Sequence, residues 1–219
     1  MSTTPDRPPV ERDPVALAAR ARELRDRPGR ALLGLTGPPG AGKSTLGAAL
    51  VQELGPGAAL LPMDGFHLAN SVLAALGRAD RKGAPDTFDG AGYADLLRRL
   101  REAAGTETVY APRFHREFEE SYAAELAIGP DVRLVVTEGN YLLLPEEPWV
   151  RVPPLLDEVW YLDPDEELRL SRLVARHISF GRAPEQAHAW AHGTDQANAV
   201  RIAATRPAAD LVVRPAPRG

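Results

Sequence analysis

Residues 37–44 carry the sequence GPPGAGKS, which matches the pattern GxxxxGK[ST] in full. The apolar run ALLGLT (31–36) precedes this segment, and TLGAALVQEL (45–54), which has helical character, follows it. A strand that ends in a glycine-rich turn and reopens as a helix aims backbone N–H groups and the positive helix end at one point, where phosphate binds. The sequence therefore predicts a site for a nucleoside triphosphate.

The side chains of this phosphate loop have separate predicted tasks. Its three glycines permit positive φ angles or a close approach of the backbone to phosphate oxygens. Lys43 supplies a point charge for the terminal phosphates, and the Ser44 hydroxyl is a predicted ligand of Mg²⁺. The nucleotide-binding residues expected in the loop are Gly37, Pro38, Pro39, Gly40, Ala41, Gly42, Lys43, Ser44 and Thr45. The loop indicates the ligand but not the reaction.

Composition limits the class of protein. The chain has 219 residues, 44% of them hydrophobic, which suits one sizeable α/β domain. A net charge of -4 argues against a general electrostatic grip on nucleic acid or an anionic membrane. The lack of cysteine excludes disulfides and thiolate catalysis. Without a signal-like segment or a run of roughly 18 apolar residues, we expect a cytoplasmic protein with no membrane partner. The oligomeric state is open, a homodimer included.

The order of predicted elements indicates the fold class. Residues 1–14 are rich in proline and charge and are expected to form a flexible arm, followed by a single domain over 15–219. Alternating strands and helices predict a mostly parallel sheet with helices on both faces, as in P-loop NTPases, and ligands at the carboxyl ends of the strands. Strands are expected at 31–36, 58–64, 108–111, 132–138, 158–163 and 209–213, and helices at 13–27, 43–54, 69–76, 93–103, 164–179 and 184–205.

Two acidic residues, Asp64 and Glu138, end buried strands at the same predicted edge as the phosphate loop. Phosphoryl transfer to a hydroxyl requires neutralisation of phosphate charge, a metal ion and a carboxylate near the acceptor. We expect Glu138 to hold Mg²⁺ together with Ser44, and Asp64 to act as the general base opposite Lys43. The competing interpretations are a helix-capping carboxylate for Asp64 and a capping or surface carboxylate for Glu138.

Three further segments resemble a known superfamily. MDGFHLAN (63–70) and RKGAPDTFD (81–89) resemble the paired signatures of the bacterial type I pantothenate kinase, uridine kinase and phosphoribulokinase superfamily. EGNYLLL (138–144) is more similar to its branch of nucleoside/nucleotide kinase-like proteins, some of them named fructose-transport kinases. The resemblance spans about residues 31–213 and implies a P-loop kinase with a small helical lid.

The resemblance also implies an acceptor site and a lid. The acceptor-side residues would be Asp64, Phe66, His67, Lys82, Asp89, His115, Arg116 and Tyr141. RLSRLVARHISFGR (169–182) resembles an arginine-bearing lid, here about 169–192, in which Arg172 and Arg176 would contact the nucleotide. An ordinary loop histidine at His115 and a solvated arginine-rich helix face are the alternatives. GTDQANA (193–199) departs from the pattern of relatives, so its contribution to binding is open.

These residues predict an ATP- and Mg²⁺-dependent kinase that transfers the γ-phosphoryl group to a hydroxyl of a small polar metabolite of sugar or nucleoside type. A pantothenate kinase-like enzyme and a nucleotide-binding sensor without an acceptor are the alternatives. The chain lacks the NKxD motif of a regulatory GTPase, and a sensor has no need of Asp64 as a base. The sequence does not name the acceptor, and it leaves open whether the donor is ATP or another triphosphate.

Overall fold

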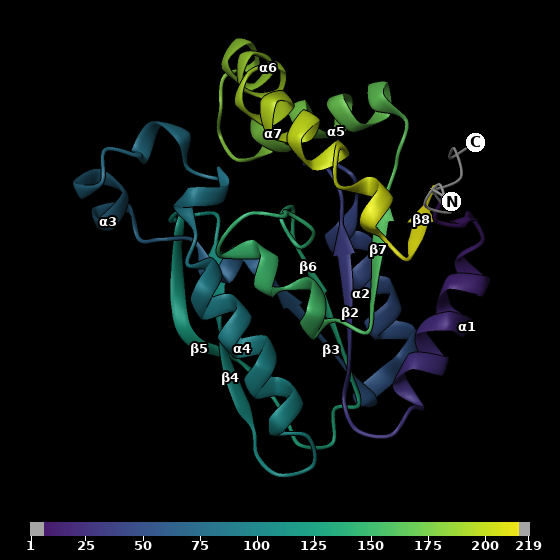
Figure 1. Cartoon of the computed structure of the whole chain (residues 1–219). Coiled ribbons are helices and arrows are strands. Elements are labelled where there is room, and N and C mark those ends of the chain that lie inside the picture. Colours follow the sequence, from purple (N-terminus) through teal and green to yellow (C-terminus); the bar gives the residue numbers. More distant parts are fainter. Residues whose placement is uncertain (1–6, 215–219) are drawn as a thin grey trace, which may run out of the picture.

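The computed structural model describes residues 7–214, and its centre is a six-stranded sheet in which all neighbouring strands are parallel (Figure 1). The strand order is β1-β8-β7-β2-β6-β3. The strands are β1 (Val10–Glu11), β2 (Ala31–Thr36), β3 (Ala58–Pro62), β6 (Leu134–Glu138), β7 (Glu158–Leu162) and β8 (Leu211–Val213). The phosphate-loop strand β2 lies between β7 and β6, which places the loop near the middle of the sheet edge.

Helices cover both faces of the sheet, so the predicted three-layer α/β fold is confirmed. On one face lie α1 (Pro14–Arg25) and α2 (Lys43–Leu54), and on the other lies α4 (Gly90–Glu102) (Figure 1). Successive side chains of a strand point to opposite faces. Leu32 accordingly packs into the core beneath α4, whereas Leu33 packs into the core beneath α1 and α2.

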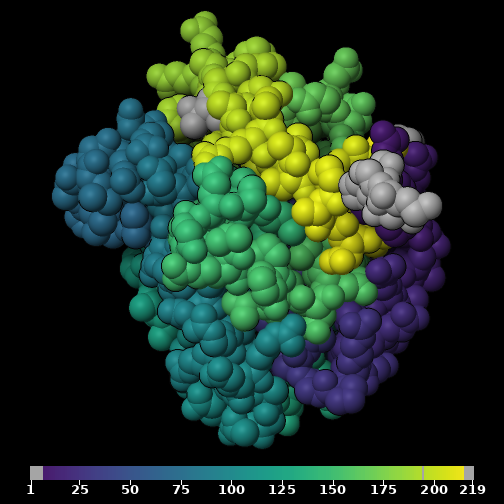
Figure 2. Space-filling model, in the orientation of Figure 1, coloured from purple at the N-terminus to yellow at the C-terminus, as the bar shows by residue number. Residues whose placement is uncertain are grey.

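Three helices gather above the carboxyl edge of the sheet: α5 (Glu166–Ser179), α6 (Pro184–His192) and α7 (Thr194–Ala203) (Figure 1). The short helix α3 (Asn70–Ala75) lies to one side of this edge, and its segment projects from the body of the molecule (Figure 2). Within residues 7–214, no helix combines the length and apolar character needed to cross a bilayer.

A β-hairpin stands apart from the main sheet and corrects one prediction. The strand expected at 108–111 is longer, β4 (Val109–His115), and pairs antiparallel with β5 (Glu120–Ile128), which the sequence did not reveal. Most of β5 is exposed, so its sequence has no continuous apolar run to mark a strand. The segment between the two strands therefore forms a hairpin tip at the carboxyl edge of the sheet.

Two other predictions need correction. The end of the expected flexible arm is ordered, because Val10 lies opposite Val212 in the β1–β8 pair; residues 1–6 of the arm lie outside the described residues. The single helix expected over 184–205 is broken at Gly193, which lies outside helical geometry with φ -97° and ψ -100°. A Cβ at Gly193 would lie 2.9 Å from the Ala189 carbonyl oxygen, so glycine suits this break.

Candidate active site

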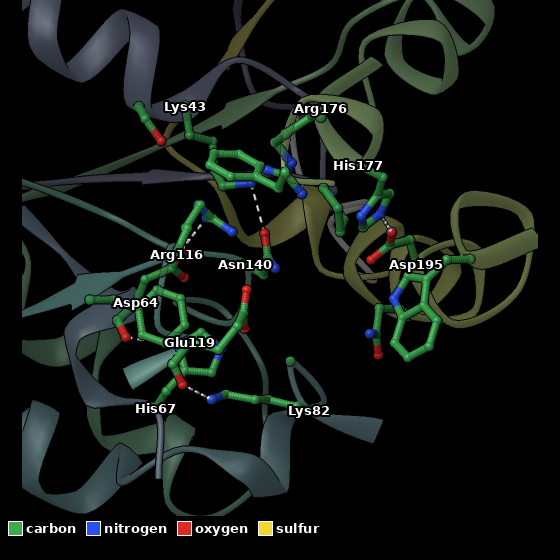
Figure 3. A pocket seen from close by; sticks show the side chains of 18 of the residues that line it. Lys43, Asp64, His67, Lys82, Arg116, Glu119, Asn140, Arg176, His177 and Asp195 are labelled. Carbon is green, nitrogen blue, oxygen red and sulfur yellow. Dashed lines mark hydrogen bonds and ion pairs between the residues drawn. The ribbon is translucent and has the colours of Figure 1, made fainter. Parts of the chain in front are cut away.

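A cavity of about 940 Å³ lies at the carboxyl edge of the sheet (Figure 3). Its walls come from the phosphate loop, the loop after β3, the tip of the β4–β5 hairpin and the helices α5 to α7. The cavity brings together most of the predicted site residues: Pro39, Gly40, Gly42, Lys43, Ser44, Thr45, Asp64, His67, Lys82, Arg116, Glu138, Arg172 and Arg176. Gly37, Pro38 and Ala41 belong to the loop but do not line the cavity.

The Lys43 ammonium is held by two backbone carbonyls of the phosphate loop and by Asn140. Its Nζ donates to the Gly37 carbonyl at 2.8 Å, to the Pro38 carbonyl at 3.1 Å and to Asn140 Oδ1 at 2.7 Å. Burial lowers the pKa of Lys43 to about 8, and the negative charge of Glu138 offsets this only in part. Sequence reasoning missed Asn140, whose signal was its place two residues after the end of β6. The ammonium is thus desolvated and oriented before any phosphate arrives.

Ser44 and Glu138 meet at the end of β6. The Ser44 hydroxyl donates to Glu138 Oε1 at 2.8 Å, and Glu138 is buried. Burial and the negative charge of Asp64 raise the pKa of the Glu138 carboxyl. A buried carboxylate beside a hydroxyl is a hard oxygen donor set of the kind that Mg²⁺ prefers, with phosphates and water completing the shell. No cluster of three His, Asp or Glu side chains suited to a metal occurs in the described part of the chain, which is compatible with such a sparse site.

Asp64 lines the same cavity and lies just after β3, the strand that pairs with β6 (Figure 3). It lies in the single-turn 3₁₀ helix Met63–Phe66 after β3, and its Oδ2 accepts from Arg116 Nη2 at 2.6 Å. Burial alone would raise the pKa of the Asp64 carboxyl, but interactions with His67 and then Arg116 outweigh it and hold the pKa below its usual range. The carboxylate is therefore ionised and ready to accept a hydrogen bond.

The ring of His67 lies between two aromatic rings beside Asp64. The centroid of the His67 ring lies 4.0 Å from that of the Phe88 ring and 4.5 Å from that of the Phe114 ring. The His67 Nδ1 is 2.8 Å from the Asp64 carbonyl oxygen. Burial lowers the pKa of His67. Because burial opposes the charged form, the ring contributes a mostly neutral, flat surface to the acceptor side.

Lys82 links the loop before α4 to the hairpin. Its Nζ donates to Asn70 Oδ1 at 2.6 Å and also to the backbone carbonyl of Glu119, and it lies 5.2 Å from the centroid of the Phe114 ring. Glu119 has a φ of 53°, which is uncommon for a side chain other than glycine. Lys82 therefore has a structural task in holding the hairpin tip as well as a place at the cavity wall.

Four residues expected on the acceptor side do not line the cavity, and Phe66 and Tyr141 are two of them. The Phe66 ring packs against the core, edge-on to Tyr93 with 5.2 Å between the ring centroids. Tyr141 is buried, and its hydroxyl donates to the Gly83 carbonyl. Both support the wall of the site from behind.

Asp89 and His115 also differ from expectation. Asp89 is the N-cap of α4, where its Oδ1 accepts from the Gly92 amide at 2.8 Å. His115 lies on the outer part of the hairpin, with its Nε2 2.6 Å from Glu125 Oε2. These contacts give Asp89 a helix-capping task and leave His115 as an ordinary hairpin histidine.

The helix α5 presents arginines to the cavity and one arginine to the phosphate loop. Arg172 and Arg176, one turn apart, line the cavity, and their contact with a nucleotide stays a prediction. Burial lowers the pKa of Arg176, and the positive charge of Arg116 lowers it further. Arg169 was not predicted: it is 1% exposed and donates from Nη1 to the Pro39 carbonyl at 3.0 Å. Helix α5 is thus attached directly to the phosphate loop.

The segment 193–199, whose role the sequence left open, packs against α5. His177 Nε2 lies 2.7 Å from Asp195 Oδ2, and the two side chains are each 14% exposed (Figure 3). Asn198 also lines the cavity. Nearby, the Arg182 guanidinium lies 4.1 Å from the centroid of the Trp190 ring. These side chains form a polar and aromatic part of the cavity wall that the sequence analysis did not predict.

The geometry agrees with the comparison with known proteins. The model of the Phosphoribulokinase / Uridine kinase family matches residues 32–216, most of the chain. The chain belongs to this family. The chain is also 35% identical over 190 residues to the uncharacterized protein YggC of Escherichia coli. This match covers 84% of this chain and 77% of YggC.

Two other similarities point to kinases in this family. The chain is 41% identical over 133 residues to the ATP-dependent kinase-like protein notR' of Aspergillus versicolor, a match that covers 58% of this chain and 77% of notR'. A crystal structure from Silicibacter sp. TM1040, of a protein provisionally named a fructose transport system kinase, superposes with a TM-score of 0.83 and 37% identity, covering 92% of this chain and 99% of that one. The fold is therefore that of a P-loop kinase.

Proposed function

We propose that this member of the family is an ATP-dependent kinase that phosphorylates a hydroxyl of a small polar metabolite of sugar or nucleoside type. One observation carries the proposal: a single cavity is lined by Lys43, Ser44 and Glu138 and also by Asp64, which follows the neighbouring strand β3. The first three suit the donor phosphates, and the fourth suits an acceptor. Family membership supports phosphoryl transfer, and the cavity supports a separate acceptor.

In this proposal, the phosphate loop binds the triphosphate through its backbone amides and Lys43. Ser44 and Glu138 would hold Mg²⁺, which, when bound, neutralises charge on the phosphate oxygens. Asp64 accepts the proton of the acceptor hydroxyl as that oxygen bonds to the γ-phosphorus, the bridging oxygen–phosphorus bond breaks, and ADP departs. Arg172 and Arg176 would place positive charge beside the transferring phosphoryl group, where it would stabilise the negative charge of the transition state.

The cavity walls support a small acceptor. His67 and Phe114 present ring surfaces, while Asp64, Lys82 and Arg116 supply hydrogen-bonding groups. A few polar groups among flat apolar ones is the usual make-up of a small-molecule site. The similar Silicibacter protein is named a fructose transport system kinase, which agrees with a sugar-type acceptor.

We also propose that residues 169–192 act as a lid within a single kinase domain that begins near residue 15. These residues include most of α5 and all of α6, which lie above the carboxyl edge of the sheet (Figure 1) and contribute Arg172, Arg176 and Trp190 to the cavity wall. Closure of such a lid excludes water and completes the set of cations around the phosphates. The attachment of Arg169 to the phosphate loop would make the base of α5 the fixed end of this motion.

ADP release measured with a panel of sugars, nucleosides and pantothenate tests the proposal. We expect one acceptor class to stimulate ADP release and to yield a phosphorylated product by mass spectrometry. ATP binding without stimulation by any member would instead favour a nucleotide-binding sensor. Stimulation by pantothenate alone would favour the pantothenate kinase-like alternative.

A further inference from the structure

Arg116 lies at the tip of the hairpin and joins three parts of the cavity wall. Its Nη2 donates to Asp64 Oδ2 at 2.6 Å, which is its one side-chain hydrogen bond among residues 7–214. Its guanidinium also lies 5.9 Å from the ring centroids of both Phe114, on the hairpin, and Phe180, just after α5. The side chain keeps 37% of its surface exposed, so it can exchange partners without disturbing the core.

This ion pair bears on a problem that every kinase faces when ATP is bound and the acceptor is absent. A free carboxylate opposite the γ-phosphate can accept a proton from water as readily as from an acceptor hydroxyl. A carboxylate that accepts a charge-assisted hydrogen bond from a guanidinium is a weaker base, because the cation favours the ionised form. Arg116 therefore reduces the basicity of Asp64 as long as the pair persists.

We propose that Arg116 restrains Asp64 from activating water in the acceptor-free enzyme, and that an anionic group on the acceptor draws Arg116 away and releases the carboxylate. The substrate class inferred is thus a hydroxylated metabolite that carries a carboxylate or phosphate. This inference rests on the proposed kinase function. It makes Arg116 a positioning residue for Asp64 and a determinant of acceptor specificity.

The surroundings of Phe114 support an anionic group. Lys82 lies 5.2 Å and Arg116 lies 5.9 Å from the centroid of the same ring. Lys82 is bonded to an amide oxygen and a backbone carbonyl, and it has no carboxylate within ion-pair distance among the described residues. Arg116 uses one of its five donors. A carboxylate or phosphate beside the ring would meet two cations with donors to spare.

The step that the restraint prevents is hydrolysis. A water oxygen bonds to the γ-phosphorus, its proton passes to Asp64, and the bond between the γ-phosphorus and the bridging oxygen breaks to leave ADP and inorganic phosphate. The same movements with the acceptor oxygen in place of water give the phosphorylated product. Removal of Arg116 is therefore expected to raise hydrolysis, because Asp64 is no longer restrained. It is expected to lower transfer at limiting acceptor concentration, because the anionic group loses a binding partner.

The first test is acceptor-free ADP release by the full chain with Mg²⁺ and ATP. Arg116→Ala should raise this rate by about tenfold or more, since a positioned general base contributes at least two orders of magnitude to such a step. Arg116→Ala combined with Asp64→Asn should return to the wild-type rate, and Arg116→Lys should restore most of the restraint. The matched control is Arg113→Ala, because Arg113 lies on β4, three residues before Arg116, and pairs with Glu125 at 3.3 Å, away from the cavity.

An unchanged or lower rate in Arg116→Ala would overturn the restraint, and so would a raised rate that persists without Asp64. Arg116→Gln is measured in parallel and decides the matter if the alanine variant fails to fold by circular dichroism. A gain of hydrolysis is a readout that mere structural damage would not produce.

The second test uses matched neutral and anionic acceptors: glycerol with glycerate, glucose with gluconate, and uridine with uridine monophosphate. The anionic member of at least one pair should stimulate ADP release by the wild type more than its neutral partner. Arg116→Ala should raise KM for that member, and Arg116→Lys should restore it in part. Equal stimulation by both members would overturn the anionic class. If no acceptor of any kind is phosphorylated, the kinase function itself fails, while the acceptor-free rates still decide whether Arg116 restrains Asp64.

Discussion

Arg169 Nη1 donates to the carbonyl oxygen of Pro39 at 3.0 Å, which joins the first turn of helix α5 to the phosphate loop. The guanidinium is almost fully buried, and its other donors bond to Glu166 at 2.8 Å and 2.7 Å and to Gln196 on α7. One side chain therefore connects the loop, α5 and α7.

Replacement of Arg169 by leucine is expected to lower the free energy of unfolding by about 2–3 kcal/mol, because a charged hydrogen-bonding group is lost and the Pro39 carbonyl is left without its partner. Urea unfolding followed by circular dichroism measures this change. Arg172→Leu serves as the control, since Arg172 is only partly buried and should change the unfolding free energy by less than about 0.5 kcal/mol. Equal effects of the two variants would contradict the role of Arg169.

Glu138→Gln is expected to weaken the dependence of activity on Mg²⁺. The amide keeps the shape of the side chain and an oxygen for Ser44, but it removes the negative charge that would hold the ion. We expect the Mg²⁺ concentration for half-maximal ADP release to rise by about 10–100-fold. Glu146→Gln is the matched control, because Glu146 is 54% exposed and pairs with Arg201 outside the cavity. An unchanged Mg²⁺ requirement in Glu138→Gln would exclude the proposed metal role.

His67 predicts a pH dependence of stability. Its pKa in the folded protein lies below the ordinary value of about 6.5, because burial outweighs the attraction of Asp64 and because Lys82 and Arg116 also oppose its charge. As pH falls through 6.5, the unfolded chain binds a proton that the folded chain does not, so the unfolding free energy falls until the pH reaches the folded pKa.

Urea unfolding at pH 7.5, 6.5 and 5.5 measures this effect. The decrease should be shallower in His67→Phe, which keeps a ring between Phe88 and Phe114 but cannot bind a proton. The remaining histidines are common to both proteins, so the difference in slope isolates His67. Identical slopes would show that His67 does not contribute.

Gly65 predicts how the turn that carries Asp64 meets the hairpin. A Cβ at Gly65 would overlap the backbone carbonyl of Pro112 on β4, so Gly65→Ala must shift one of the two segments. We expect a loss of about 1–3 kcal/mol in unfolding free energy, together with lower activity because Asp64 moves. Gly129→Ala is the control, since nothing lies within 4 Å of a Cβ there. Equal stability of both variants would contradict the tight contact.

Much of the site could be predicted because its residues end buried strands. The phosphate loop, Asp64 and Glu138 each come at or just after the end of an apolar run, and the carboxyl ends of parallel strands share one edge of a sheet. Phe66 was placed on the cavity wall because it shares a motif with Asp64. The two side chains leave the same tight turn in different directions, and the sequence does not indicate which one faces the cavity. Asn140 and Arg169 were missed because their partners, 97 and 130 residues away along the chain, become neighbours only in the fold.

The hairpin shows a different limit. The strand β5 packs little apolar surface, so no hydrophobic pattern marks it, and its pairing with β4 depends on the backbone. This pairing carries Arg116 to Asp64 and His115 away from the cavity, although the two residues are adjacent in sequence. The acceptor side therefore depends on tertiary contacts more than the phosphate loop does.

The most direct test of the central claim is a comparison of wild type and Asp64→Asn in transfer from ATP to the acceptor found in the screen, with ATP affinity measured by titration calorimetry. The amide preserves shape but cannot accept the proton, so the rate of transfer should fall by roughly 10²–10⁴-fold. ATP affinity should stay within about twofold, because the hydrogen bonds of Asp64 go to Arg116 and His67 and not to the phosphate loop. Transfer at the wild-type rate by Asp64→Asn would contradict the account, and so would a parallel loss of ATP binding.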